Sequence, residues 1–152
     1  MNYKSSFPFF DDNSIALILK DIKATLRSGV LTGGLHTEEL EKKFRSYLSA
    51  KHAVAVSSGA SSLEIPLRYF GVKGKEVIVP TNTFVATPNS VAFAGAKPVF
   101  ADMREDTLSI DPNDVRHKIS SKTAGIIVVH IAGLICPQIC LLYTSPSPRD
   151  RS

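Results

Sequence analysis

Hydrophobic residues recur along the chain in two patterns, one with helical spacing and one in short unbroken runs. Apolar residues three or four positions apart predict helices over residues 15–27, 37–48, 61–71 and 83–95, and from residue 112 onward. Short, almost wholly apolar runs are typical of strands covered on both faces, and they lie at residues 52–56, 76–80, 97–102 and 125–132.

Small polar residues and glycines mark where several of these elements begin and end. Ser14 is the expected N-cap of the first helix, and Gly29 is its expected stop. Thr37 is expected to open the second helix, because its hydroxyl precedes an acidic first turn. Asp111 followed by Pro112 is typical of a cap and a first helical residue, so the last helix is predicted to begin there.

From residue 52 onward, predicted strands and helices alternate. This order is typical of an α/β fold with a mainly parallel sheet and helices on its faces. The 152 residues suffice for one domain with its own core.

Composition and charge argue against several classes of binding partner, namely nucleic acids, membranes and metals. The net charge of +4 comes from lysines and arginines dispersed among acids, so nucleic-acid binding is not expected. The chain has neither an apolar leader nor an apolar run of about eighteen residues, so we expect a cytoplasmic protein with no membrane partner. Cys136 and Cys140, spaced C-x3-C without further cysteine or histidine partners, predict neither a metal site nor a disulfide framework.

The stretch VSSGASSLE, residues 56–64, joins a predicted strand to a predicted helix through small residues. Free backbone N–H groups at the positive end of a helix favour a phosphate, Gly59 allows close approach, and the hydroxyls of Ser58, Ser61 and Ser62 can add donors. The alternative is an ordinary helix start, with Ser58 as N-cap and Gly59 in a tight turn. Neither a phosphate-binding Walker pattern nor a nucleophile elbow is present in this stretch.

A second stretch extends the pattern, because PTNTFVATPNSVAFAGAKPVFAD follows AVSSGASSLEIPL in order. Together they resemble the DegT/DnrJ/StrS family of sugar aminotransferases, and the similarity extends over roughly residues 8–138. The resemblance implies an α/β fold, the large domain of a fold-type I transferase that uses pyridoxal 5′-phosphate, here truncated. Residues 1–139 would be the N-terminal part of this cofactor-binding domain.

The resemblance also assigns cofactor-binding residues. Gly59 and Ala60 would offer N–H groups to the cofactor phosphate with Ser61 close by, and Phe84 would stack on the pyridine ring. Proteins of this family usually carry threonine where Ala60 stands, so one hydroxyl donor is missing, and Ser58 or Ser61 is the candidate substitute. Phe84 as a core aromatic residue remains the alternative.

The loop at residues 31–34 corresponds by resemblance to one that lies near the sugar site, often that of the neighbouring subunit. An ordinary connection between two helices remains the alternative for this loop.

No catalytic or metal-binding residue is assigned in this chain. By resemblance, the lysine that forms the Schiff base and the aspartate beside the ring nitrogen would follow the strand predicted at 125–132. We therefore expect the chain by itself to be inactive. His130 and Cys136 are interpreted as structural residues.

The last segment departs from the pattern. The peptide CLLYTSPSPRD matches the translation of a transposase adapter used in preparing DNA libraries, so residues 140–152 are expected to be a non-native tail. A natural flexible tail rich in proline and serine is the alternative.

The resemblance implies transfer of an amino group from an amino acid, with glutamate the expected donor, to a nucleotide-linked keto-sugar by a homodimeric enzyme. Two alternatives stay open. One is a sugar dehydratase of the same fold and cofactor, in which histidine replaces the lysine, and the other is a non-catalytic phosphate-binding module.

Overall fold

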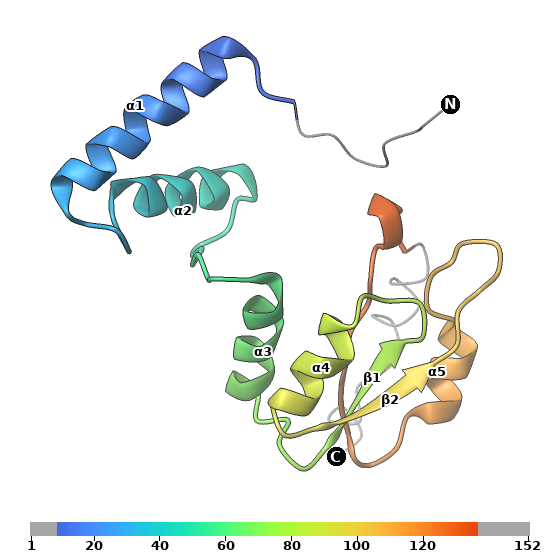
Figure 1. Ribbon diagram of the computed structural model, residues 1–152. Coiled ribbons are helices and arrows are strands. Elements are labelled where there is room, and N and C mark those ends of the chain that lie inside the picture. The colour runs from blue at the N-terminus through green and yellow to red at the C-terminus, as the bar shows by residue number, and fades with distance from the viewer. Residues whose placement is uncertain (1–8, 137–152) are drawn as a thin grey trace. The chain divides into compact units, whose positions relative to one another are not determined.

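The computed structural model describes residues 9–136, and the chain divides into two compact units at residues 55 and 56 (Figure 1). The predicted tail at residues 140–152, including Cys140, lies outside the described residues. The two units are described separately below.

The first unit contains the helices α1 (Asp12–Ser28) and α2 (Leu35–Tyr47). The Asp11 carboxylate caps α1 by accepting a hydrogen bond from the Ser14 N–H at 2.7 Å. The prediction of Ser14 as N-cap was therefore wrong, because the helix begins at Asp12 and Asp11 caps it, which places Ser14 in the first turn. Gly29 ends α1 in the left-handed conformation with φ of 70°, as predicted.

Helix α2 begins earlier than predicted. Gly34 is its N-cap, and the Thr37 N–H donates to the Gly34 carbonyl at 2.9 Å, so Thr37 lies inside the first turn instead of opening the helix. Neither α1 nor α2 buries a side chain.

Residues 52–56 form no strand, which corrects the prediction for HAVAV. Within the part of the chain that the structure describes, no strand pairs with this segment, and the Val54 side chain is 78 % exposed. Apolar residues of high strand propensity still need a hydrogen-bonded neighbour and a covering layer.

The second unit is built on a parallel sheet of β1 (Glu76–Pro80), β2 (Lys97–Ala101) and β3 (Thr123–Ile126), in the order β2-β1-β3. The predicted α/β class with a parallel sheet and flanking helices is confirmed. Strand β1 lies in the centre, where the last four of its five residues are buried.

Strand β3 begins two residues before the predicted segment 125–132 and ends well before that segment does. The Ile127 N–H still donates to the Ile78 carbonyl at 2.8 Å. Pro80 is next on that side of β1 and has no N–H for the Ile127 carbonyl, so pairing stops there. The chain then turns into the short helix η1 (Ile131–Gly133).

Helices cover both faces of the sheet (Figure 1). On one face, α4 (Ala86–Phe93) packs Val91 against Val77 and Val79, and α3 (Gly59–Tyr69) contacts α4. On the other, α5 (Pro112–Lys118) packs against the buried side chain of Ile78. The predicted cap of α5 is confirmed, because the Asp111 carboxylate accepts from the Asn113 N–H at 2.9 Å.

No helix in the described part of the chain is both long and apolar enough to cross a membrane.

Candidate phosphate-binding site

The amino end of α3 is the candidate phosphate-binding site in the second unit. Helix α3 precedes β1 and runs in the opposite direction to it, so α3 starts at the edge where β1 ends (Figure 1). Ser58 is its N-cap in extended conformation, and Gly59 is the first helical residue. The glycine is therefore not in a tight turn, whereas Ser58 as N-cap is confirmed.

Two backbone donors remain at this helix end. The Ser61 N–H donates to the Ser58 hydroxyl at 3.2 Å, and the Ser62 N–H to the Ser58 carbonyl at 3.1 Å. Within the described residues, no hydrogen bond uses the N–H of Gly59 or Ala60. These two groups lie at the positive end of the helix dipole, where an anion is stabilised.

Three hydroxyls gather at the same helix end. The Ser61 Oγ lies 3.0 Å from the Ser58 Oγ and 3.4 Å from the Ser57 Oγ, and all three residues are exposed or half-buried. Ser62 differs, because its hydroxyl donates to the Gly59 carbonyl at 2.7 Å. The expectation that Ser62 adds a donor is wrong for this structure, since its single proton is already used inside the helix.

The space in front of the helix is open. A Cβ added at Gly59 would meet no other atom within 4 Å, and the φ of Gly59 is not in the left-handed region. Neither backbone conformation nor crowding therefore requires glycine there. Unpaired N–H groups with a hydroxyl cluster fit the acceptor oxygens of a phosphate.

Phe84 lies between the end of β1 and the start of α4, and its side chain is 75 % exposed. The alternative in which it fills the core does not hold. An exposed aromatic ring just beyond the end of a central strand is available to stack on a planar ligand.

The helices α3 and α4 are joined near both ends of α3. The Ser90 Oγ, on α4, lies 3.2 Å from the carbonyl oxygen of Ala60, and the Arg68 guanidinium donates to the Phe93 carbonyl at the end of α4. The role of Ser90 could not be predicted, because nothing in the sequence distinguishes it from its polar neighbours Thr87 and Asn89.

His130 and Cys136 hold a turn together beyond β3. The His130 Nδ1 accepts a hydrogen bond from the Cys136 N–H at 3.0 Å, and Cys136 is completely buried in the core beside Ile78. Among the described residues, no group of three or more histidine, cysteine or acidic side chains could hold a metal ion.

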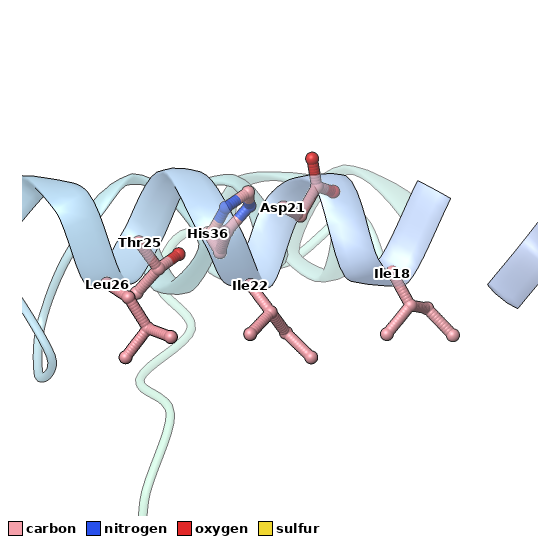
Figure 2. Close-up of a pocket in the computed structure, with 6 residues that line it drawn as sticks. All are labelled: Ile18, Asp21, Ile22, Thr25, Leu26 and His36. Carbon is pink, nitrogen blue, oxygen red and sulfur yellow. The ribbon is translucent and has the colours of Figure 1, made fainter. Parts of the chain in front are cut away.

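The first unit has two open hollows of its own. One, of about 450 Å³, is lined by the end of α1, the first turn of α2 and the loop between them, which includes the predicted sugar-site loop at residues 31–34. The other, of about 310 Å³, follows α1, where Figure 2 shows Ile18, Ile22 and Leu26 pointing to one side of the helix and Asp21 away from them. Its lining is mostly apolar, and no hydrogen bond or ion pair joins its two titratable residues, Asp21 and His36.

Comparison with known proteins links the sequence of this chain to one family. The model of the DegT/DnrJ/EryC1/StrS aminotransferase family matches residues 13–142. Among curated proteins, the chain is 38 % identical over 125 residues to the spore coat polysaccharide biosynthesis protein SpsC of Bacillus subtilis, covering 82 % of this chain and 32 % of SpsC. It is 39 % identical over 108 residues to the GDP-perosamine synthase of Vibrio cholerae, covering 70 % of this chain and 29 % of that protein.

Solved structures give the same result. The crystal structure of NtdA from Bacillus subtilis with bound cofactor PMP superposes with a TM-score of 0.81 at 31 % identity, covering 93 % of this chain and 35 % of NtdA. The chain thus spans about a third of the length of the relatives it matches.

Proposed function

We propose that this chain, which belongs to the DegT/DnrJ/EryC1/StrS aminotransferase family, supplies the phosphate-holding part of an enzyme that aminates a nucleotide-linked keto-sugar. In the balanced reaction an amino acid, which we propose is glutamate, becomes its 2-keto acid while the sugar ketone becomes an amine. The similarity to a GDP-perosamine synthase supports the nucleotide-sugar substrate. Residues 1–139 would belong to the large domain of a cytoplasmic homodimer.

The cofactor fitting these residues is pyridoxal 5′-phosphate, which supplies a carrier for the amino group and an electron sink. The N–H groups of Gly59 and Ala60 would hold its phosphate. The Ser61 hydroxyl would be a neighbouring donor, in place of the threonine hydroxyl that Ala60 lacks. Phe84 would cover the face of the pyridine ring and orient it.

The observation that carries this proposal is the pair of unpartnered N–H groups at the amino end of α3. A dianionic phosphate accepts such hydrogen bonds strongly, and it interacts favourably with the helix dipole. The chain's membership of an aminotransferase family supports pyridoxal 5′-phosphate as the ligand that carries this phosphate.

Gly59→Pro tests the phosphate site in the complete product of the gene. Proline removes one N–H at the first helical position, where it is well tolerated, and the extended conformation of Ser58 suits a residue before proline. Gly59→Ala is the matched control, because it keeps the N–H and its Cβ meets no neighbouring atom.

We expect Gly59→Pro to weaken pyridoxal 5′-phosphate binding by roughly ten- to hundredfold, the effect of losing one hydrogen bond to a charged group, and Gly59→Ala to weaken it far less. Equal affinities in the two variants would contradict the phosphate site. Activity is measured as amino-sugar and 2-keto acid formed in equal amounts from glutamate and a nucleotide-linked keto-sugar. Cofactor binding without amino transfer would favour the dehydratase or the non-catalytic module.

A further inference from the structure

We propose that Ser90 is a positioning residue for the phosphate site, and that its hydroxyl orients the peptide group between Ala60 and Ser61. This inference rests on the proposed function, because it concerns the same site. Ser90 does not touch the ligand in this proposal but acts through the backbone of α3.

Ser90 is completely buried, and its hydroxyl lies within reach of two carbonyl oxygens. One belongs to Ala86, one turn earlier on α4, at 2.7 Å, and the other belongs to Ala60 on α3 at 3.2 Å. A serine in any helix can bond to the carbonyl four residues earlier. The hydroxyl has one proton, so the two carbonyls share it and the bond to Ala86 is the shorter one. The contact with Ala60 is different in kind, because it joins two helices at the start of α3.

The Ala60 carbonyl and the Ser61 N–H are the two ends of one planar peptide group. Holding the carbonyl oxygen therefore also fixes the direction of the Ser61 N–H, which points to the hydroxyl cluster at the amino end of the helix. A hydrogen bond to a carbonyl also polarises its peptide group, which strengthens the bond from the Ser61 N–H to the Ser58 hydroxyl. The buried hydroxyl thus positions the cluster of Ser58 and Ser61 hydroxyls beside the Gly59 and Ala60 N–H groups that we propose hold the phosphate.

The same contact also connects the two parts of the candidate site, which are the amino end of α3 and the segment that carries Phe84. Helix α4 starts two residues after Phe84, which we propose covers the pyridine ring. Since Ser90 joins α4 to the first turn of α3, it fixes the phosphate donors relative to the helix that follows the aromatic residue.

Arg68 provides a matched control at the far end of the same helix pair. Its guanidinium donates to the Phe93 carbonyl and pairs with Glu64 at 2.7 Å. Arg68→Met therefore loosens α3 against α4 without altering the peptide group at the phosphate end. A general loosening of the pair would affect both variants, whereas a positioning effect is confined to Ser90.

The experiment measures the affinity of the complete gene product for pyridoxal 5′-phosphate and for pyridoxal, which lacks the phosphate. The ratio of the two dissociation constants reports the contribution of the phosphate alone. We expect Ser90→Ala to reduce this ratio about three- to tenfold, as for the loss of one neutral hydrogen bond, and Arg68→Met to leave it unchanged. Ser90→Cys, similar in size but a weaker donor, should give an intermediate ratio and a ³¹P resonance of the bound phosphate between those of wild type and Ser90→Ala.

An unchanged ratio in Ser90→Ala and Ser90→Cys, even with lower thermal stability, would overturn the inference and leave a purely structural serine. An equal decrease in Arg68→Met would also overturn it. A wild-type protein that binds pyridoxal as tightly as pyridoxal 5′-phosphate would contradict the proposed function itself, so the two failures are distinguishable.

Discussion

In the first unit, Ile15, Ile18 and Ile22 follow one face of α1, and each keeps more than two fifths of its surface exposed. In the second unit, Ile78 and its neighbours on β1 are completely buried. The apolar residues are of the same kind in both places, and the difference lies in whether other strands and helices cover them. Strand β1 has a neighbour on each side and a helix layer on each face, whereas no side chain of α1 or α2 is buried. Periodicity thus predicts an element but not its burial, which needs a second surface.

The strongest test of this comparison is a pair of isoleucine truncations. Ile78→Ala should lower the free energy of unfolding by about 2–5 kcal/mol, because it leaves a cavity in the centre of the sheet. Ile22→Ala, at a residue that is 49 % exposed, should change it by less than about 1 kcal/mol. Urea denaturation of both variants and the wild type measures the difference, and similar costs at the two positions would show that α1 is as well packed as β1.

A smaller effect is expected from the two aspartate N-caps. Asp111→Ala removes the cap of α5, which packs on the sheet, and should destabilise the second unit by about 1 kcal/mol. Asp11→Ala removes the same type of cap from α1 and should increase local amide exchange in the first turn, while the exchange of the Val79 amide in β1 stays unchanged. Faster exchange at Val79 in Asp11→Ala would mean that the two units unfold together.

The smallest expected effect is a pH dependence at Asp114. The Asp102 N–H and the Lys118 ammonium both donate to its carboxylate at 2.6 Å, and these contacts lower the pKa of Asp114 below its ordinary value of 3.8. Because the folded pKa is lowered, the stabilisation is fully present above the ordinary value, and it is lost as the pH falls through the lowered one.

Asp114→Asn should therefore be less stable than the wild type near neutral pH, and the gap should narrow on acidification below pH 3.8. Thermal unfolding at a series of pH values measures this gap. A gap that is constant across the series would assign the contribution of Asp114 to packing instead of charge.

Much of the second unit could be predicted from the sequence, because local and tertiary preferences agree there. Residues 77–79 are β-branched and lie in the centre of the sheet, and the predicted and observed bounds of β1 coincide at 76–80. Asp111 and Pro112 define the start of α5 by local chemistry alone. In contrast, HAVAV has the composition of a strand without a partner among the described residues, and the end of β3 depends on Pro80 in another strand.

The candidate site likewise has features that could be predicted from the sequence and features that could not. The helix start at Ser58 and Gly59 follows from local capping rules, so its position could be predicted. Which hydroxyls are available to a ligand could not be predicted, since the Ser62 hydroxyl donates to a carbonyl of its own helix. The contact between Ser90 and Ala60 joins residues thirty positions apart, and no local pattern encodes it.

The strand order has a further consequence for where ligands meet this fold. From β1 the chain passes over one face of the sheet to β2, and from β2 it returns over the opposite face to β3 on the other side of β1. The boundary between β1 and β3 is therefore a topological switch point, where open α/β sheets place a binding crevice beyond the carboxyl ends of their strands. The loop that follows β1 carries Phe84 and the segment that follows β3 carries His130, so both flank this boundary.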